Sequence, residues 1–206
     1  ATRAAGGLSN RYGRIDDLVV GLRLVAPART LDVRALPGRD HGPDLAEMVL
    51  GSEGVLGVVT EATVRAHPLP PARRFASRLF PSFTDGLVAL RAMARDDALP
   101  DMTYLSDEEE TRFAAAQAGV GPQGGGGFAG LGLKVVGMRG YTLEQGSLLL
   151  MGFEGSPTRV ADRRRRALRH ARPAANLGSG PAKRWYSERF DTPYIRDSLV
   201  DHGILV

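Results

Sequence analysis

A glycine-rich stretch, GSEGVLGVVTEATVRAHPLP at residues 51–70, is the part of the sequence best suited to ligand chemistry. Gly51, Gly54 and Gly57 fall within seven positions. Glycine is entropically costly in regular structure and is favoured where the backbone takes a positive φ or where another group approaches it closely. Two interpretations are open on these residues alone. Either the glycines end a helix and turn the chain into a strand, or they let a ligand rest against the backbone.

Other catalytic chemistry is limited by composition. The chain has no cysteine, which excludes disulfides, thiolate metal sites and a thiol nucleophile. Its histidines lack the spacing of metal ligands, so no metal site is expected. We expect loop or structural positions for His41 and His67 and solvated helix faces for His170 and His202.

The Gly-Gly-Gly-Gly run at 124–127 lacks the Lys-Ser/Thr of a phosphate-binding P-loop. A flexible surface loop over the low-complexity segment 114–133 is therefore the favoured interpretation. The run DRRRR at 162–166 spreads around a helix rather than along one face, which predicts a solvated helix and no nucleic-acid partner.

Length and charge limit the classes of protein to which the chain can belong. The 206 residues suggest one large domain or two small ones, and a hydrophobic fraction of 43% is ordinary for a globular chain. The net charge is +4 and the pI is about 9.8. No apolar run is long enough to span a bilayer, and we expect a cytoplasmic protein without a transmembrane segment. The first residue is not methionine, and we expect an internal segment of a longer protein.

The first 70 residues predict an antiparallel hairpin, a short helix and a strand. Residues 16–36 alternate, with Leu18, Val20, Leu22 and Leu24 on one face and Val19, Arg23 and Val25 on the other. Asp44 fits an N-cap, with Glu47 three residues later as in a capping box. Gly51 fits the left-handed position after the helix, and 58–66 reads as a strand.

Residues from 71 onward predict one β-α-β unit and the first half of a second. Residues 73–80 read as a strand, followed by a helix from Ser82 whose apolar stripe is Phe83, Leu87, Leu90 and Ala94, and then by a strand near 100–107. A buried strand at 146–155 precedes a helix at 156–172, with Ser156 as N-cap and Pro157 at the first helical position. The fold class is therefore α+β.

Three motifs give the chain a family resemblance. ATRAAGGLSNRYGRIDDLVV at 1–20, GPDLAEMVLGSEGVLGVVTEATVRAHPLP at 42–70 and RWYSERFDTPYIRD at 184–197 occur in order along the sequence. Together they resemble the FAD-binding oxidases and transferases of the vanillyl-alcohol-oxidase superfamily, which carry a PCMH-type FAD-binding domain. Within it the chain is most similar to the alkyldihydroxyacetone-phosphate synthase branch. The resemblance implies that 1–70 is the second part of an FAD-binding domain and 71–206 the first part of a ferredoxin-like substrate or cap domain.

The resemblance also implies a cofactor and its contacts. FAD would lie against two segments with small side chains, and backbone groups would grip it: Thr2, Arg3, Ala4 and Ala5, and Glu53, Gly54, Val55, Leu56, Gly57, Val58 and Val59. We expect the turn at 53–59 to lie beside the segment at 2–5. The family's pyrophosphate loop and its catalytic Tyr and His residues match no part of this sequence, so no catalytic residue is assigned here.

Two arginines are implied to bind substrate. Arg196 and Arg39 match family arginines, and a guanidinium pairs bidentately with phosphate or carboxylate. The alternative for Arg196 is an ion pair with Asp191 or Asp197 on a helix surface. The implied partner is a small-molecule or lipid-like anionic substrate, and a homodimer and peripheral membrane contact stay open.

Three functions are left as alternatives. The first is ether-lipid formation, in which a fatty alcohol replaces the acyl group of an acyl-dihydroxyacetone phosphate. The second is an FAD-linked oxidoreductase of a 2-hydroxy acid or a similar alcohol. The third, more remote, is a basic binding module without enzymatic activity.

Overall fold

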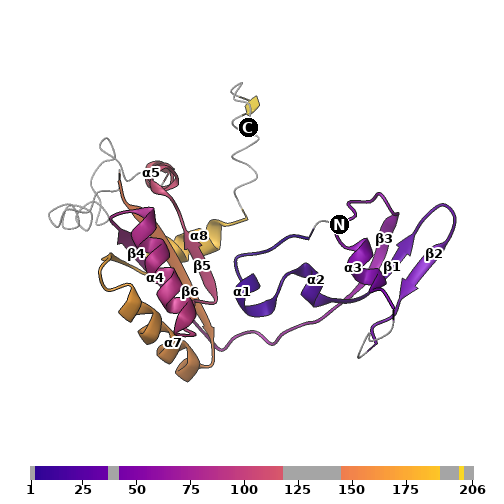
Figure 1. The fold of residues 1–206 in the computed structure, drawn as a ribbon, viewed down its shortest axis with the longest axis horizontal. Coiled ribbons are helices and arrows are strands. Elements are labelled where there is room, and N and C mark those ends of the chain that lie inside the picture. The colour runs from indigo at the N-terminus through magenta and orange to yellow at the C-terminus, as the bar shows by residue number, and fades with distance from the viewer. Residues whose placement is uncertain (1–2, 37–41, 118–144, 191–199, 202–206) are drawn as a thin grey trace. The chain divides into compact units, whose positions relative to one another are not determined.

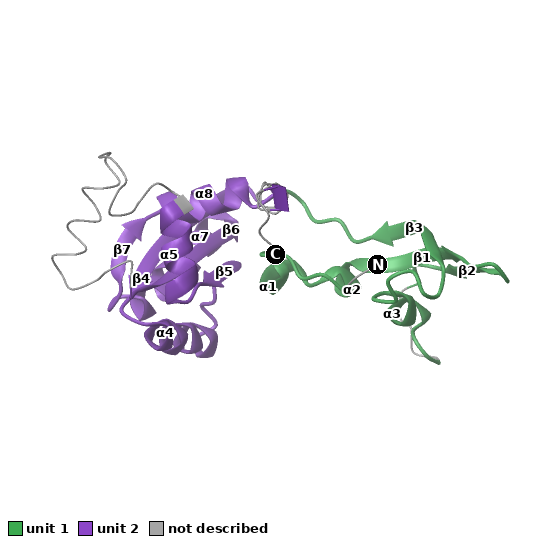
Figure 2. Cartoon of the chain, turned by 90° about the horizontal axis from the view of Figure 1, so that it is seen from above, with its two compact units in different colours: residues 1–69 green, residues 70–206 purple. Residues whose placement is uncertain are grey.

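The computed structural model describes residues 3–36, 42–117, 145–190 and 200–201. The chain divides into two compact units, residues 1–69 and 70–206, which Figure 2 draws in separate colours. Each unit has its own hydrophobic core. The assignment of these regions to parts of an FAD-binding domain and a cap domain stays a prediction.

Unit 1 contains a three-stranded antiparallel sheet in the order β2-β1-β3. Its elements are α1 (Ser9–Tyr12), α2 (Ile15–Leu18), β1 (Val19–Val25), β2 (Thr30–Val33), α3 (Leu45–Val49) and β3 (Val58–Val64). The expected hairpin is formed by β1 and β2, and Ala26 N donates to Arg29 O at 3.0 Å across the turn between them. The short helices α1 and α2 were not expected from the sequence.

The expected alternation along β1 is wrong at its first residues. Val19 is buried in the same cluster as Leu22 and Leu24, although strict alternation would put it on the opposite face. The pairing of β1 with β3 is irregular between Val19 and Gly21. Such an irregularity inserts a residue and changes which side chains point inward, and this brings Val19 into the core. Leu18, expected in the strand, ends α2 instead.

Helix α3 forms as its sequence predicts. The Asp44 side chain accepts hydrogen bonds from the N–H groups of Ala46 at 2.8 Å and Glu47 at 3.2 Å, a cap that typically stabilises a helix by about 1 kcal/mol. Ala46 and Val49 are buried and belong to the same core cluster as the inward side chains of β1. The turn that follows α3 is thereby fixed against the sheet.

Unit 2 is built on a four-stranded antiparallel sheet in the order β5-β6-β4-β7 (Figure 1). Its elements are β4 (Ala72–Phe80), α4 (Phe83–Arg95), β5 (Met102–Leu105), α5 (Glu108–Gln117), β6 (Ser147–Gly155), α7 (Pro157–His170), β7 (Ala175–Gly178) and α8 (Gly180–Glu188). Each β-α-β pattern is split, because β6 lies between β4 and β5 and β4 lies between β6 and β7. This is the ferredoxin-like arrangement, which confirms the expected fold class.

Helices pack on both faces of this sheet. Ala76 and Phe80 of β4 belong to the core cluster that includes residues of α4 and α7. Phe75 and Ser77, which point the other way, contact α8: the rings of Phe75 and Tyr186 are 5.2 Å apart, and Ala182 N donates to Ser77 Oγ at 3.0 Å. Because both faces are covered, the central strand β6 is buried along almost its whole length.

The expected apolar stripe of α4 is correct at Leu90, which packs against the core, but wrong at Leu87 and Ala94, which are exposed. The buried residues of the helix are Gly86, Ala89 and Met93, whereas Leu87 is 47% exposed. Gly86 allows this orientation, since a Cβ there would lie 2.7 Å from Leu105 Cδ1. The N-cap at Ser82 is confirmed: its side chain accepts from Asp85 N at 3.2 Å.

The arginine run on α7 is less solvated than expected. Arg163 donates to Asp101 at 2.9 Å, and the side chain of Asp101 is 1% exposed. Asp101 also accepts from Glu154 N at 2.7 Å, so the buried carboxylate is hydrogen-bonded on both oxygens. A charge buried this deeply without a partner would be strongly destabilising, which gives Arg163 a structural role.

The segment between β5 and β6 begins with a helix that the sequence did not predict. Residues 114–117, expected in a loop, belong to α5, and 118–133 lie outside the described residues. Four hydrogen bonds of side chains join Ser106, which follows β5, Thr111 of α5 and the first residues of β6. Thr111 Oγ1 accepts a hydrogen bond from Leu148 N at 3.1 Å and shares one with Ser106 Oγ at 2.9 Å. Ser106 Oγ donates to Leu148 O at 3.1 Å, and Ser147 Oγ donates to Ser106 O at 2.5 Å.

Within the described residues, no helix has the length and apolar character needed to cross a membrane.

Candidate cofactor-binding surface

The turn between α3 and β3 has the shape that the sequence predicts. Ser52 N donates to Val49 O at 3.1 Å, Val55 N to Ser52 O at 3.0 Å and Gly57 N to Gly54 O at 3.2 Å, so consecutive tight turns lead into β3. The backbone takes positive φ angles at Glu53, 50°, and at Gly54, 93°. A positive φ is uncommon for a residue other than glycine, so Glu53 is held in a sparsely populated conformation.

The three glycines of this turn serve different purposes. A Cβ on Gly57 would lie 2.6 Å from Val25 O, and one on Gly51 would lie 3.1 Å from Arg3 Cγ. Gly57 is therefore required by a backbone contact within the chain, whereas Gly51 is favoured by its φ of 87°, because the side chain of Arg3 can move aside. At Gly54 nothing lies within 4 Å of the Cβ position. Gly54 is the glycine of this turn whose exposed backbone can meet a flat ligand directly.

Arg3 joins the N-terminal segment to this turn. Its Nε donates to Leu50 O at 3.0 Å and its Nη2 to Glu47 O at 2.5 Å. The last carbonyl groups of a helix lack intrahelical partners, and a guanidinium satisfies them well. The contact brings Arg3 beside the start of the glycine turn, where it lies against Gly51. Sequence reasoning did not identify Glu47 and Leu50 here, because a backbone acceptor leaves no signal in residue type.

Small or apolar side chains cover the two segments. Ala4 and Ala5 are exposed, as are Val55 at 87%, Leu56 at 46% and Val58 at 67%. In the described part of unit 1, β3 pairs on one side only, with β1. An exposed apolar strip beside an open backbone suits a flat, largely apolar ring system whose polar edge needs hydrogen-bond partners.

The charged groups near the N-terminal segment are paired. Arg14 donates to both carboxylate oxygens of Asp16, at 3.1 and 2.6 Å. That hydrogen bond lowers the pKa of Asp16, burial opposes it, and the charge of Arg3 lowers the pKa further. Across β1 and its neighbours, Arg23 bridges Asp32 and Glu61. Arg14 and Arg23 are therefore engaged by acidic side chains within unit 1.

Several predicted site residues lie outside the described residues, namely Thr2, Arg39 and Arg196. Of the others, Arg3, Ala4 and Ala5 come from the segment before α1, and residues 53–59 come from the turn and the first residues of β3. Arg3 bonds the last turn of α3 and lies against Gly51, immediately before residues 53–59, so the grouping of the two segments into one site stays a prediction. The part of the chain that the structure describes holds no group of three or more His, Cys, Asp or Glu side chains that could bind a metal ion.

Sequence comparison defines the class of protein. The chain belongs to the FAD-linked oxidase family: residues 69–206 match the model described as "FAD linked oxidases, C-terminal domain". FAD is the cofactor that this membership indicates. Unit 2, with its split β-α-β sheet, corresponds to the matched region almost residue for residue.

Comparison with individual proteins shows which members of this family the chain is similar to. The chain is 35% identical to the alkyldihydroxyacetonephosphate synthase of Dictyostelium discoideum over 100% of its own length and 34% of that protein. A solved structure titled "alkyldihydroxyacetonephosphate synthase in P1" superposes with a TM-score of 0.80 and 35% identity, covering 98% of this chain and 37% of that one. The mitochondrial D-lactate dehydrogenase [cytochrome] of Arabidopsis thaliana is 34% identical over 54% of this chain and 20% of that protein. The chain thus spans about a third of the length of the synthases it matches.

Proposed function

We propose that this chain supplies part of the FAD site and the cap of an enzyme with alkyldihydroxyacetone-phosphate synthase activity. In that reaction a fatty alcohol replaces the acyl group of an acyl-dihydroxyacetone phosphate. The observation that carries the proposal is the likeness to the synthases over the entire chain, with a TM-score of 0.80.

The glycine turn fits the cofactor that this activity requires. The backbone of Glu53, Gly54 and Val55 and the apolar side chains up to Val59 would hold the flavin, with Ala4 and Ala5 on the neighbouring segment. Gly54 is the open position in this cradle, where a side chain would hold a flat ring away from the backbone. The flavin, when bound, supplies the electron-accepting ring that the chemistry needs, and the chain's part is to position and shield it.

Substrate binding is assigned by family resemblance to Arg196 and Arg39. Each would pair its guanidinium with the anionic group of the substrate, because a planar fork of donors matches phosphate or carboxylate geometry. A homodimer, peripheral membrane contact and a cytoplasmic location are further predictions that separate experiments can address.

A second candidate is an FAD-linked oxidoreductase of a 2-hydroxy acid. It is favoured by the likeness to a D-lactate dehydrogenase, which extends over about half of the chain. The non-enzymatic binding module is disfavoured by the family membership.

One experiment separates these candidates. The intact protein containing this chain is purified and its flavin absorbance recorded, and it is then assayed with palmitoyl-dihydroxyacetone phosphate plus hexadecanol and, separately, with D-lactate plus a redox dye. We expect a yellow protein that forms the ether product and does not reduce the dye. Dye reduction without ether formation would support the oxidoreductase, and a colourless protein that cannot be reconstituted with FAD would contradict both proposals.

A further inference from the structure

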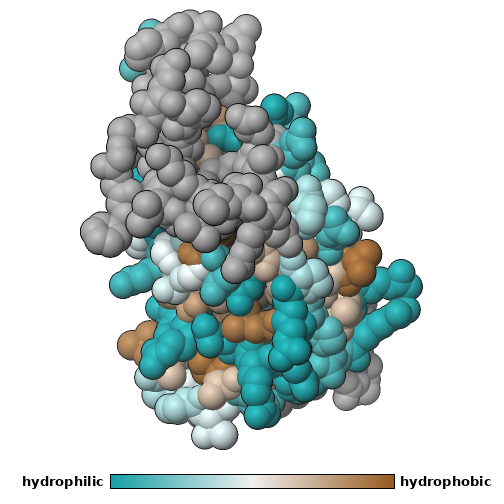
Figure 3. Space-filling view, turned by 90° about the vertical axis from the view of Figure 1, so that its left-hand side faces the viewer, coloured by the Kyte–Doolittle hydropathy of each residue, from teal (hydrophilic) through white to brown (hydrophobic). Residues whose placement is uncertain are grey.

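A hollow of about 670 Å³ lies on unit 2 between α4 and α7. Its lining residues come from the two helices and the residue that follows α4: Val88, Arg91, Ala92, Arg95, Asp96, Arg169 and His170. The face of the molecule drawn in Figure 3 carries hydrophilic side chains with small hydrophobic areas between them. The volume falls within the range of about 300–1,000 Å³ that is usual for small-molecule sites.

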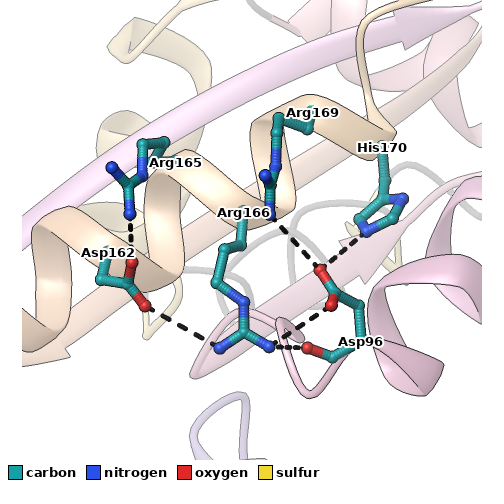
Figure 4. A network of polar contacts seen from close by, with 6 residues as sticks. All are labelled: Asp96, Asp162, Arg165, Arg166, Arg169 and His170. Atoms are coloured by element: carbon teal, nitrogen blue, oxygen red, sulfur yellow. Dashed lines mark hydrogen bonds and ion pairs between the residues drawn. The ribbon is translucent and has the colours of Figure 1, made fainter.

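The single acidic group of the lining is already engaged by basic side chains of α7. Asp96 lies 3.0 Å from His170 Nε2, 3.5 Å from Arg166 Nη2 and 3.8 Å from Arg169 Nη2 (Figure 4). The hydrogen bond with His170 lowers the pKa of Asp96, partly opposed by burial, and the charges of the two arginines lower it further. Asp96 is therefore ionised at neutral pH, and its negative charge is shared among these α7 side chains.

Two arginines of α4 add positive charge that the described residues do not neutralise. Arg91 and Arg95 are exposed and one helical turn apart, and neither has a side-chain hydrogen bond or ion pair within the described part of the chain. Like charges spaced four residues apart on a helix repel each other by a few tenths of a kcal/mol. Arg166 divides its charge between Asp96 and Asp162 and is not part of the lining. The lining itself holds three guanidinium groups, those of Arg91, Arg95 and Arg169, and one aspartate, which leaves an excess of positive charge.

Apolar side chains lie beside these arginines. Val88 is 64% exposed, and Ala92 lies on the same helix one turn later. Their position follows from the orientation of α4, in which Gly86, Ala89 and Met93 face the core. The hollow therefore combines cationic groups from two helices with an apolar wall.

We propose that this hollow binds an organic diphosphate, a ligand with two linked anionic groups and an apolar moiety. Because the cations come from both α4 and α7, two linked phosphates can engage both helices at once, whereas one phosphate cannot as readily do so. Guanidinium groups bind phosphate through paired, charge-assisted hydrogen bonds, and the apolar moiety can rest against Val88. This binding site uses neither the glycine turn nor Arg39 and Arg196, so it is independent of the proposed function.

The test is calorimetric titration of the 206-residue chain with ADP at low ionic strength. We expect saturable binding that weakens as salt is added, because the attraction between exposed charges is screened. The double variant Arg91→Ala/Arg95→Ala should bind ADP at least about tenfold more weakly, since two charge-assisted contacts are lost. Arg159→Ala removes an exposed arginine from the first turn of α7, away from the hollow, and should bind like the wild type.

Four results would overturn the proposal. They are an absence of saturable ADP binding, unchanged ADP binding by the double variant, an equal loss in Arg159→Ala, and equally tight binding of adenosine. If a polyglutamate peptide binds in an Arg91- and Arg95-dependent manner while ADP does not, the partner is an acidic protein segment and the small-molecule assignment is wrong. Both arginines are exposed and alanine favours helix, so circular dichroism should find the double variant folded.

Discussion

Replacing single glycines of the 51–57 turn with alanine separates its folding role from its cofactor role. At Gly57 the new Cβ would lie 2.6 Å from the carbonyl oxygen of Val25, which is backbone and cannot easily move. The residue also has a φ of 144°, which L residues rarely adopt. We take about 1–3 kcal/mol for the backbone strain and about 1–3 kcal/mol for the overlap. Gly57→Ala should therefore destabilise unit 1 by roughly 2–6 kcal/mol.

Gly54→Ala should have a smaller effect on folding. Its φ is 93°, so the backbone strain remains, but nothing lies within 4 Å of the new Cβ. The expected cost is about 1–3 kcal/mol. If FAD lies against this backbone, however, the same methyl group would hold the ring away, and the intact protein should lose flavin.

The assay combines thermal unfolding of the 206-residue chain, followed by circular dichroism, with the flavin absorbance of the intact protein. In a domain of 60–100 residues, 1 kcal/mol shifts the Tm by about 4–8 °C, so Gly57→Ala should lower the Tm of unit 1 by more than about 10 °C. Gly178→Ala is the matched control: Gly178 lies in unit 2, has a φ of 74° and also has open space at its Cβ position. It should leave flavin content unchanged. If Gly54→Ala retains full flavin content, or lowers the Tm as much as Gly57→Ala does, the assignment of Gly54 as the cofactor-facing glycine is refuted.

Four further predictions concern binding and pH. In the intact protein, Arg196→Lys and Arg196→Ala should reduce kcat/KM roughly ten- to hundredfold without loss of FAD, because one charge-assisted contact of about 1.5–3 kcal/mol is removed. If steady-state kinetics are those of the wild type in both variants, Arg196 is a surface ion-pair residue. With Arg91→Ala and Arg95→Ala, which remove the diphosphate site proposed on unit 2, the 206-residue chain should bind FAD weakly or not at all in a fluorescence titration, because the family's pyrophosphate loop matches no part of this sequence and phosphate contacts anchor a dinucleotide; tight binding would contradict this. Asp96→Asn should lower the Tm at neutral pH, and the difference in Tm from the wild type should shrink as the pH falls below about 3.8. The reason is that the pKa of Asp96 is depressed in the folded state, so its stabilisation is lost only when the carboxylate is protonated. A difference in Tm that does not change with pH would refute this. Burial and the hydrogen bond to Glu110 raise the pKa of Tyr104 to about 12, so the stability of the fold should fall as the pH rises from about 10 towards 12. In a series of Tm measurements against pH, Tyr104→Phe should flatten this alkaline decline. An identical decline in the variant would contradict the role of Tyr104.

Local signals in the sequence predicted much of the fold. The caps at Asp44, Ser82 and Ser156 were correct because a cap depends only on a side chain and the N–H groups two or three residues later. The insertion of β6 between β4 and β5 could not be derived in this way. It depends on pairing between residues as distant as Ala72 and Gly155, which the family resemblance, and not the alternation of residues, implied.

The errors arose where tertiary contacts override periodicity. The buried face of α4 is set by the close approach of Gly86 to Leu105, and His170, expected on a solvated face, pairs with Asp96 from another helix end. The arginine run was interpreted from its spacing alone, and spacing carries no information about the buried Asp101 that binds Arg163.

The candidate site was predictable as a turn but not glycine by glycine. Sequence could indicate that 51–57 turns tightly, since glycine spacing is a local signal. Which glycine faces outward depends on Val25 and Arg3, which lie more than 25 residues away in sequence. The substrate assignments for Arg39 and Arg196 come from the family resemblance and stay predictions.

The hydrogen bonds among Ser106, Thr111, Ser147 and Leu148 hold β5 and β6 together independently of the chain that links the two strands. The end of β5 and the start of β6 are bonded to each other, so the register of the two strands does not depend on how many residues lie between them. Doubling the length of a flexible connection adds only about 0.6 kcal/mol of closure entropy. Because these bonds hold β5 and β6 in register, we expect β5, β6 and the described helices of unit 2 to keep their fold when an epitope or fluorescent label is inserted between residues 117 and 145.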